Sequence, residues 1–449
     1  MRLLCTVLTQ AARFWYNRRV KLFCVKNKLV RAFREVRLSR YAGITVSKPL
    51  KLKRFILAAA ACALLIPLVL MDAYRTDARI AEFWTSNIAR GWEQAAGTVT
   101  SVFPFSVFEF FVCVLILVGG YLFVRLVINL CRAHFKKILT GLLAVAVGAI
   151  SVANLYMMSM GFGYYRDPMP LYVSGADYKA EQVKTVVEYF LPDLNALADK
   201  FERDENGCVI PPYSFAGIAE KLKAEYARLD DDYFFSYTPS GKPIVNSWFL
   251  SAVNITGITF LPTGEANLNT LTPSSYATFT LAHEIAHTKG VQREGDANVL
   301  AQYVLLNAED DYLRYCGYYK AFLDLVGAVN LAGDNKGWIE LYKQIDPRVL
   351  NEKRYENSYW ASQPTFMRDL GEFFNNLYLK INGAINGTGS YTDGNKTDTV
   401  TPVDPDTGEP ERDPETHEPV IIPVYSTVQK MFFYIYEARM GGPPPIVSE

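Results

Sequence analysis

The stretch HEIAHTKGVQREGDAN, residues 283–298, decides how the rest of this chain is interpreted. Its first five residues place His283 and His287 four positions apart, with Glu284 beside the first histidine. On a helix this spacing stacks the two imidazoles on one face, one turn apart. The pattern is typical of a zinc site in which the glutamate acts as a general base. Because the chain has only four histidines, the pattern rarely arises by chance.

The residues around this pattern favour a helix, a tight turn and a second helix. Thr272 and Pro273 offer a hydroxyl cap and a proline at the first position of a helix spanning about 274–289. Gly290 is suited to end that helix in a left-handed conformation. A second helix is then expected to open near Arg293. The histidine pair therefore has the helical setting that metal binding requires.

A catalytic zinc ion needs three protein ligands and one open position. In one common zinc-peptidase spacing the third ligand lies six residues after the second histidine, but that position is Arg293, which cannot bind a metal. Glu294 follows directly, and we predict it as the third ligand, with Asp296 as the alternative. Glu294 would also suit the positive end of a helix dipole without any metal. Asn298, one turn later, is predicted to orient Glu294.

Glu284 is the predicted catalytic residue, since a carboxylate beside a metal-bound water can take its proton and pass it to a leaving amine. Such a reaction also needs a donor that stabilises the developing oxyanion. The sequence does not select among five candidate donors of this kind, which are Tyr303, Arg293, Tyr315, Tyr318 and Tyr359.

Glu265 and Asn267 precede the helix that carries the histidines. They either line the substrate cleft or lie in a solvated loop, and we favour the loop.

Residues 161–385 have the composition of a soluble, mainly helical domain with a small sheet, so the predicted class is α+β. Residues 234–260 are rich in β-branched and aromatic residues and are predicted to form two or three strands. The last of these, residues 254–260, is a candidate edge for an extended peptide substrate. The aromatic stripe of residues 364–381 is expected to face the core. Further helices are expected over about 177–201, 214–229, 312–329 and 338–345.

Three largely uncharged apolar stretches precede this domain, and each is long enough to cross a bilayer. They are residues 55–71, 105–124 and 138–160. We therefore predict three transmembrane helices within residues 55–160, with a mixed-charge loop, 72–104, between the first two. Lys and Arg are concentrated before the first stretch and in the turn at 131–137, so both are expected in the cytoplasm. The chain is then a multi-pass protein of the cell membrane with its catalytic domain on the extracytoplasmic side.

Residues 1–54 form a basic, cytoplasmic tail with about fifteen Lys and Arg and one acidic residue, suited either to anionic lipid or to fixing the topology. Net charge over the whole chain is zero, which argues against a nucleic-acid binder.

Residues 386–424 are predicted to be a disordered, acidic, Pro/Gly-rich insertion in which His417 is a bystander. Residues 425–449 are expected to form a C-terminal helix and tail. Two of the seven cysteines, Cys208 and Cys316, could pair if this region is exported.

Several motifs together carry a family resemblance: Pro104-Phe105-Ser106 near the second span, TGEAN at 263–267, residues 283–298, Arg314-Tyr315 and Tyr359-Trp360. The combination resembles a bacterial membrane family known as domain of unknown function 3810. The resemblance covers most of residues 55–385 and implies a membrane protein with a zinc-peptidase-like core. Residues 279–306 are also similar to the core of peptidases that cleave repressors in mobile elements. That similarity implies that Glu294 is the third ligand.

We therefore expect a membrane-anchored metallopeptidase with a zincin-like domain at 161–385, a single Zn²⁺ ion, and a peptide or protein substrate. The expected metal ligands are His283, His287 and Glu294, and the expected base is Glu284. The alternative is a catalytically silent scaffold or sensor that uses the same zinc-binding fold in the lipid bilayer. An inverted topology would instead place the domain in the cytoplasm, facing a regulatory target. The sequence predicts no oligomeric state.

Overall fold

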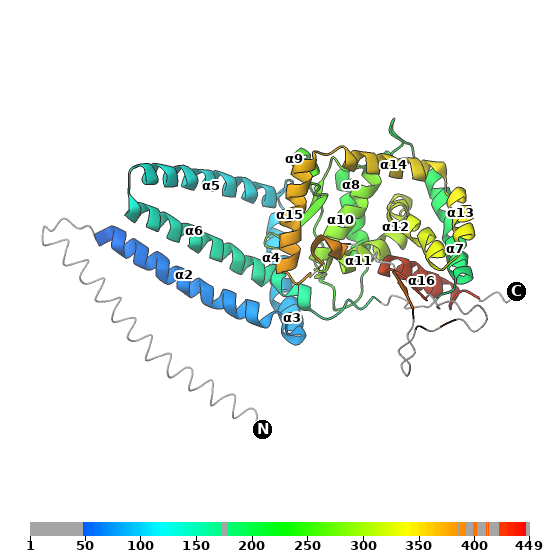
Figure 1. Cartoon of the computed structure of the whole chain (residues 1–449), viewed down its shortest axis with the longest axis horizontal. Helices are drawn as coiled ribbons and strands as arrows, with labels where there is room; N and C mark the ends of the chain where they lie inside the picture. The colour runs from blue at the N-terminus through cyan, green and yellow to red at the C-terminus, as the bar shows by residue number, and fades with distance from the viewer. Residues whose placement is uncertain are drawn as a thin grey trace, which may run out of the picture. The chain divides into compact units, whose positions relative to one another are not determined.

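A computed structural model of the chain describes residues 48–171, 178–384, 386–391, 398–401, 410, 412 and 422–445 (Figure 1). The basic tail up to residue 47 and His417, with the roles predicted for them, lie outside the described residues. The chain divides into two compact units. One comprises Met1–Ala63 and Val124–Gly148, and the other comprises Leu64–Phe123 and Ala149–Glu449. The second unit contains every element discussed below except the far parts of the three long apolar helices.

Three helices are long and apolar enough to cross a membrane, judged by length and composition. They are α2 (Lys48–Tyr74), α5 (Val107–Cys131) and α6 (Phe135–Tyr156), the last extended by the π-helical turn η2 (Met157–Gly161). Almost none of their residues is buried, so their apolar side chains need a surrounding other than water. The three predicted stretches are thus confirmed as long apolar helices.

The segment between the first two of these helices folds as part of the domain. It forms α3 (Ala78–Trp84), the π-helical turn η1 (Thr85–Ala89) and α4 (Arg90–Thr100). The Thr100 hydroxyl donates to the carbonyl of Thr263 at 2.8 Å, and Gly97 packs against Gly264 so closely that a Cβ on Gly264 would lie 2.7 Å from the Gly97 backbone. The predicted loop 72–104 is therefore mainly helical and belongs to the domain's structure.

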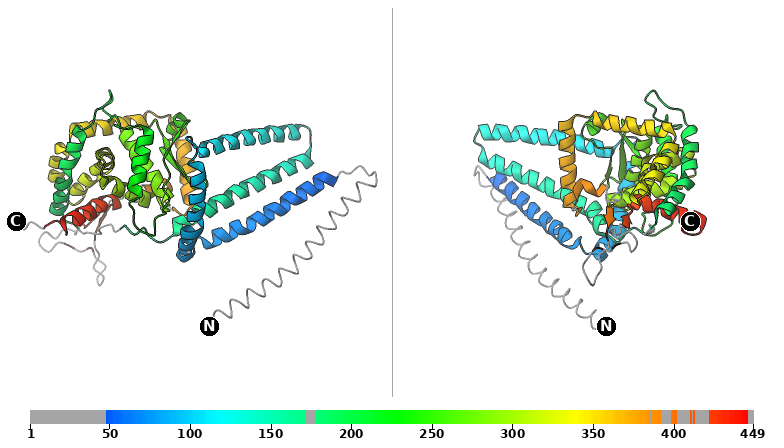
Figure 2. Two further views of the ribbon diagram at one scale, coloured as in Figure 1. Left: turned by 180° about the vertical axis from the view of Figure 1, so that it is seen from behind. Right: turned by 45° about the vertical axis from the view of Figure 1, so that its right-hand side comes forward.

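The domain is built around α10 (Ser274–Thr288), which packs on the sheet and on helices α8, α11 and α12 (Figures 1 and 2). The long helix α12 lies against five others and carries much of the aromatic core. The helices of this layer are α7 (Ala180–Asp199), α8 (Phe215–Tyr226), α11 (Glu294–Leu306), α12 (Asp311–Leu331), α13 (Asn335–Gln344), α14 (Pro347–Ala361) and α16 (Thr427–Met440). The mainly helical architecture and the predicted C-terminal helix are confirmed.

A three-stranded sheet flanks α10 and has the order β1-β3-β2. Its strands are β1 (Lys242–Ile244), β2 (Gly257–Phe260) and β3 (Glu265–Asn269). The central strand β3 runs parallel to β1 and antiparallel to β2, and all five of its residues are buried. Two strands within 234–260 were correctly predicted, but the residues between them form the short helix α9 (Ser247–Ala252).

The start of α10 differs from the prediction. The helix begins at Ser274, and Pro273 precedes it in an extended conformation, with φ −49° and ψ 137°. Thr272 therefore lies one residue too early to be its cap, and no side chain of the described residues caps this end. The predicted end is confirmed, because Gly290 has a φ of +87° just after the helix. The next helix, α11, opens directly after Arg293 as expected.

Helix α15 (Thr365–Ile381) forms where predicted. The prediction that its aromatic stripe faces the core is wrong, because the stripe is exposed. Phe366 is 75% exposed and Phe373 is 61% exposed. The buried side of α15 is narrow and is formed by Gly371 and Leu379. Gly371 lies so close to Val253 that an added Cβ would meet its carbonyl oxygen at 2.1 Å. Backbone packing at this glycine, rather than the apolar stripe, attaches the helix to the domain.

Two further predictions concern the cysteines and the Pro/Gly-rich insertion. Among the described residues, Cys208 and Cys316 are both buried and free, so the pairing that the sequence left open does not form. In the insertion, the described residues include the 3-10 helix η4 (Gly387–Tyr391) and an antiparallel pair, β4 (Asp398–Val400) with β5 (Ile422–Val424). Most of the stretch predicted to be disordered lies outside the described residues.

Candidate metal centre

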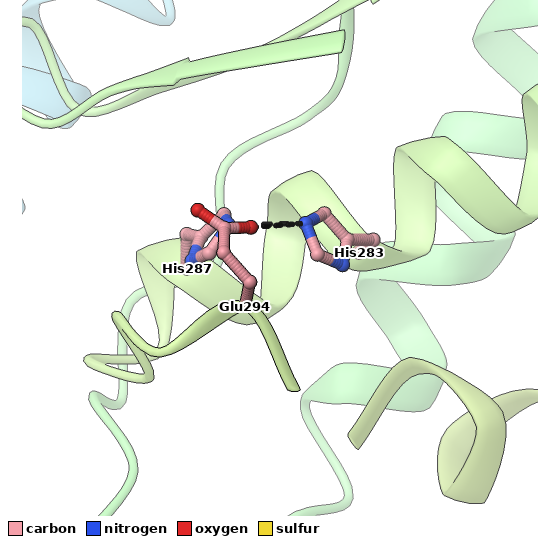
Figure 3. Close-up of side chains that lie close together, drawn as sticks. All are labelled: His283, His287 and Glu294. Atoms are coloured by element: carbon pink, nitrogen blue, oxygen red, sulfur yellow. Dashed lines mark hydrogen bonds and ion pairs between the residues drawn. The ribbon is translucent and has the colours of Figure 1, made fainter. Parts of the chain in front are cut away.

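Three buried side chains converge where α10 meets α11 (Figure 3). His283 and His287 lie one turn apart on α10, and Glu294 is the first residue of α11. The Glu294 Oε2 atom lies 3.2 Å from His283 Nε2 and 3.4 Å from His287 Nε2. The two Nε2 atoms are 3.1 Å apart. The structure therefore brings the three predicted ligands together.

The spacing of these atoms fits a small tetrahedral ion. Protein ligands lie about 2.0–2.1 Å from zinc, so two ligands of a tetrahedral site are about 3.3–3.4 Å apart. The three observed separations, 3.1, 3.2 and 3.4 Å, are close to this value. Two imidazole nitrogens and one carboxylate oxygen are also a ligand set that zinc commonly takes. Geometry and chemistry of the donors both fit the ion, and three such ligands leave a fourth position for water.

The turn between the helices sets the position of Glu294, and it depends on Gly290. A Cβ at this residue, with its left-handed φ, would lie 2.7 Å from a ring carbon of Phe235 and 2.8 Å from Arg166 Nη1. The buried Arg166 guanidinium donates to the Gly290 carbonyl at 3.1 Å and forms an ion pair with Glu82 of α3 at 2.6 Å. The segment that follows the first apolar helix therefore holds the turn of the site in place.

The orientation of His287 is fixed by its second ring nitrogen. Its Nδ1 lies 2.7 Å from the carbonyl oxygen of Val291, which requires that Nδ1 carry the hydrogen. Nε2 of the neutral ring is then an acceptor pointed at the other two ligands, as a metal ligand must be. The Gln292 amide in turn donates to the His287 carbonyl at 2.9 Å. Both contacts come from the same short turn that places Glu294.

When no metal is bound, the electrostatics of the cluster favour an ion pair between the Glu294 carboxylate and a protonated His287. Burial opposes the ionisation of Glu294, but His287 and His283 lower its pKa to about 2. Burial also opposes the charged form of His287, but the Glu294 carboxylate raises its pKa to about 9. A metal that binds to both residues must therefore displace a proton from the imidazole near neutral pH.

Glu284 is held beside the cluster by β2. The Thr259 hydroxyl lies 2.7 Å from the Glu284 carboxylate and 2.7 Å from its backbone carbonyl. Gly257 makes room for the same side chain, since a Cβ there would lie 2.6 Å from Glu284 Oε1. Burial raises the pKa of Glu284, and the nearby histidines act in the opposite direction. A raised pKa makes this carboxylate a stronger base.

The alternative third ligand, Asp296, is directed elsewhere. Its carboxylate pairs with Arg293 at 3.6 Å, and burial raises its pKa. Arg293 itself donates to the backbone carbonyls of Tyr164 and Arg166, so it joins the segment after α6 to the start of α11. Its predicted role as an oxyanion donor has no support from these contacts. The role of Asn298 in orienting Glu294 stays a prediction.

The four tyrosines that the sequence offered as oxyanion donors belong to other networks. Tyr303 packs against Tyr434, Tyr315 donates to Glu352, Tyr318 to Asp193 and Tyr359 to Ser251. Sequence reasoning missed a further candidate, Tyr378 of α15. Burial raises the pKa of Tyr378, and the charges of Glu294 and Glu284 raise it further. Its hydroxyl lies 3.2 Å from that of Tyr164. Only the fold relates this residue to the motif, which begins 95 positions earlier in the chain.

Glu265 and Asn267 do not lie in a solvated loop, so that prediction is wrong. Both are buried in β3. The Glu265 carboxylate pairs with the buried Lys242 and accepts hydrogen bonds from the backbone N–H groups of Val107 and Phe108, at 3.0 and 2.8 Å. It therefore caps the first turn of α5, where a carboxylate is also favoured by the helix dipole. The segment TGEAN therefore anchors the start of the long apolar helix α5.

A protein-family model matches residues 84–394 of the chain, which is most of its length. The chain belongs to the family described as protein of unknown function, DUF3810. The DUF3810 match begins at the end of α3 and includes α4, α5, α6, the metal centre and α15, but neither α2 nor α16. No curated protein and no solved structure matches the chain. The DUF3810 unit therefore contains both the candidate site and two of the three long apolar helices.

Proposed function

We propose that this protein is a membrane-anchored, zinc-dependent metallopeptidase with a zincin-like domain. The observation that carries the proposal is the trio of ligand atoms from His283, His287 and Glu294, all within 4.8 Å of one another. The carboxylate of Glu284 lies on the same helix, next to the first histidine. A metal site with only a structural role would have no use for this base, so the arrangement favours hydrolysis over a silent scaffold.

In this proposal the imidazoles of His283 and His287 and the carboxylate of Glu294 would hold a zinc ion. The ion would supply Lewis-acid activation of a water molecule and of the scissile carbonyl. Glu284 accepts the proton of the attacking water at its carboxylate and delivers it to the leaving amine. The contact with Thr259 keeps the Glu284 carboxylate in one orientation through both transfers.

The sheet offers a place for the substrate backbone. In the described part of the chain β2 is an edge strand, paired with β3 on one side only. An extended peptide can add to such an edge through main-chain hydrogen bonds, which do not require a particular side chain. Gly257 and Thr259 of β2 both contact Glu284, so a peptide on this strand would lie beside the base. Peptides or unfolded protein segments are the substrates that suit this arrangement.

The packing of α3 and α4 supports the predicted topology. These helices lie between α2 and α5 in the chain, yet they bond to the domain, for example from Thr100 to Thr263. The segment between the first two spans and the domain after the third must then share one side of the membrane, as three crossings require. The basic N-terminal tail and the basic turn between α5 and α6 share the other side. By the positive-inside rule that side is the cytoplasm.

Metal analysis of the purified full-length chain tests the proposal. We expect about one zinc per chain in the wild type. Glu294→Ala should lose the metal, whereas Asp296→Ala, which removes an acid two residues later on the same helix, should keep it. Glu284→Gln should also keep the metal but lose hydrolysis of a library of quenched fluorescent peptides. Zinc at full occupancy in Glu294→Ala would refute the ligand assignment.

Hydrolysis and metal binding can fail separately, which distinguishes the two proposed functions. Zinc bound by the wild type without cleavage of any library peptide would favour the scaffold or sensor alternative. Cleavage by Glu284→Gln at the wild-type rate would refute the role of the base while leaving the metal site intact. A reporter enzyme joined after residue 440 tests the orientation, and activity only in the cytoplasm would invert the proposed topology.

A further inference from the structure

Helix α15 carries an apolar stripe that is turned away from the domain. The stripe repeats every three or four residues and consists of Phe366, Leu370, Phe373, Phe374, Leu377 and Ile381, all of them exposed. The opposite side of the helix holds Gly371 and Leu379, which are buried, and Tyr378, whose hydroxyl lies 3.2 Å from that of Tyr164. Large contiguous apolar faces are rarely left in water, so this one needs a covering partner.

Two contacts place one end of α15 at the ends of two apolar helices. Arg75, just after α2, donates to the carbonyl of Ile381 at 2.9 Å. Tyr156, the last residue of α6, donates to Asn382 at 2.6 Å. Both contacts are to the C-terminal end of α15. The helix is therefore attached at the level where two of the chain's membrane spans end.

The other part of α15 is connected to the start of α5 through α9. Gly371 packs against Val253 at the end of α9. At the other end of α9, the carboxylate of Glu109 in the first turn of α5 accepts hydrogen bonds from the backbone N–H groups of Val245 and Asn246, at 2.9 and 2.8 Å. Helix α15, about 25 Å long at 1.5 Å per residue, thus extends between the ends of all three spans. In Figures 1 and 2 it crosses the direction of the adjoining part of α5.

Exposed apolar side chains continue from α15 onto the neighbouring segments. Trp248 and Phe249 of α9 are exposed, and so are Phe103 and Phe105, which lead into α5. Aromatic residues are enriched where a protein meets the boundary between headgroups and acyl chains. Exposed apolar side chains therefore occur on α15, on α9 and on the segment that leads into α5.

The charges of α15 indicate which lipid property matters. The helix carries two basic residues, Arg368 and Lys380, and two acidic residues, Asp369 and Glu372. Its formal charge is zero, so attraction to anionic headgroups contributes little. Binding of α15 to a bilayer must therefore come from burial of the apolar stripe, and this burial does not depend on headgroup charge.

We propose that α15 is an in-plane membrane helix, with its apolar stripe inserted at the boundary between lipid headgroups and acyl chains. Amphipathic helices of this kind bury their apolar face about 5–10 Å into that boundary. The bilayer then covers the outer side of α15, while its inner side contributes Tyr378 to the neighbourhood of the metal centre. The proposal rests on the three spans and the stripe, and it is independent of any peptidase activity.

Photo-crosslinking in phospholipid vesicles tests this placement. The full-length chain is made with benzoylphenylalanine in place of Phe374, reconstituted in phosphatidylcholine vesicles and irradiated. We expect covalent adducts with lipid acyl chains, detected by mass spectrometry. The matched control carries the same group in place of Glu372, an exposed residue on the polar side, and should give several-fold fewer lipid adducts. Phe366, the most exposed member of the stripe, provides a second labelling position.

The remaining outcomes are each decisive. Equal lipid labelling at 372 and 374, or adducts only with a second protein chain, would overturn the proposal. Adducts at neither position would place the stripe in water and overturn it as well. Labelling at position 374 should be unchanged when phosphatidylglycerol or added salt is present, and a requirement for anionic lipid would overturn the apolar mode of insertion. Repeating the experiment with Glu294→Ala separates the result from metal binding.

Discussion

Helices α10 and α15 differ in where they place their side chains. From Ala277 to Thr288 every residue of α10 is buried, including both histidines and Glu284. In α15 only Gly371 and Leu379 are buried, although the helix is more strongly divided into an apolar and a polar side. The less amphipathic of the two helices thus lies in the core, and the more amphipathic one lies at its edge with the apolar side outward.

The difference shows what an amphipathic pattern can and cannot predict. A periodic pattern says that a helix has two unlike faces, and in a soluble domain the apolar face turns inward. Where the chain also enters a bilayer, lipid is a second apolar environment for that face. In α10 the polar groups are buried because they have partners, such as the Thr278 and Thr288 hydroxyls, which donate to backbone carbonyls one turn earlier.

A matched pair of leucines gives the largest expected effect. Leu281 of α10 is fully buried, whereas Leu377 of α15 is 47% exposed. Leu281→Ala should reduce the free energy of unfolding by about 3 kcal/mol, because it leaves a cavity in the core. Leu377→Ala in detergent should cost less than about 1 kcal/mol. Chemical unfolding followed by circular dichroism measures both, and similar losses would contradict the assignment of Leu377 to the lipid side.

The pH dependence of metal binding tests the electrostatics of the buried region. Without metal, Glu294 raises the pKa of His287 to about 9, so the imidazole is protonated at neutral pH. Metal binding needs the neutral ring, and protons therefore compete more strongly as the pH falls. Apparent zinc affinity should rise about tenfold per unit between about pH 6 and 8. Competition with a fluorescent chelator measures it, and a flat profile would exclude this proton displacement.

Replacement of Tyr378 should have a much smaller effect than Leu281→Ala. Tyr378→Phe removes a hydroxyl that lies 3.2 Å from that of Tyr164 and 3.4 Å from that of Tyr156. We expect a loss of about 1 kcal/mol in the free energy of unfolding, with the zinc content unchanged. If the Tyr378 hydroxyl also assists catalysis, peptide hydrolysis should fall while metal retention stays constant. Loss of zinc in this variant would instead mean that α15 helps to form the metal site.

The local parts of the site could be predicted from the sequence. The histidine spacing, the turn at Gly290 and the opening of α11 each depend on residues within about one helical turn of one another. These features restrict the third ligand to the first turn of α11, which is where Glu294 lies. The three apolar helices could be predicted for the same reason, since length and composition suffice to recognise them.

The rest depends on contacts between residues far apart in the chain. Glu265 looked like a loop residue because nothing near it in sequence reveals its partners, Lys242 and the backbone N–H groups of Val107 and Phe108. Tyr378 was missed for the same reason. The outward orientation of α15 depends on Gly371, whose close contact with Val253 is a property of the assembled fold.

The position of Glu265 also bears on how the domain can be produced in isolation. A fragment that starts after the third span would lack the backbone N–H groups of α5, which donate hydrogen bonds to this carboxylate. It would also lack α4, whose Gly97 packs against Gly264. The buried Lys242–Glu265 pair would then meet water along one side. During synthesis the ribosome releases α4 well before the turn at Thr263 and Gly264, which it contacts. A water-soluble version of this domain would therefore need residues 78–100 joined back to it, together with hydrogen-bond donors that replace the α5 N–H groups at Glu265.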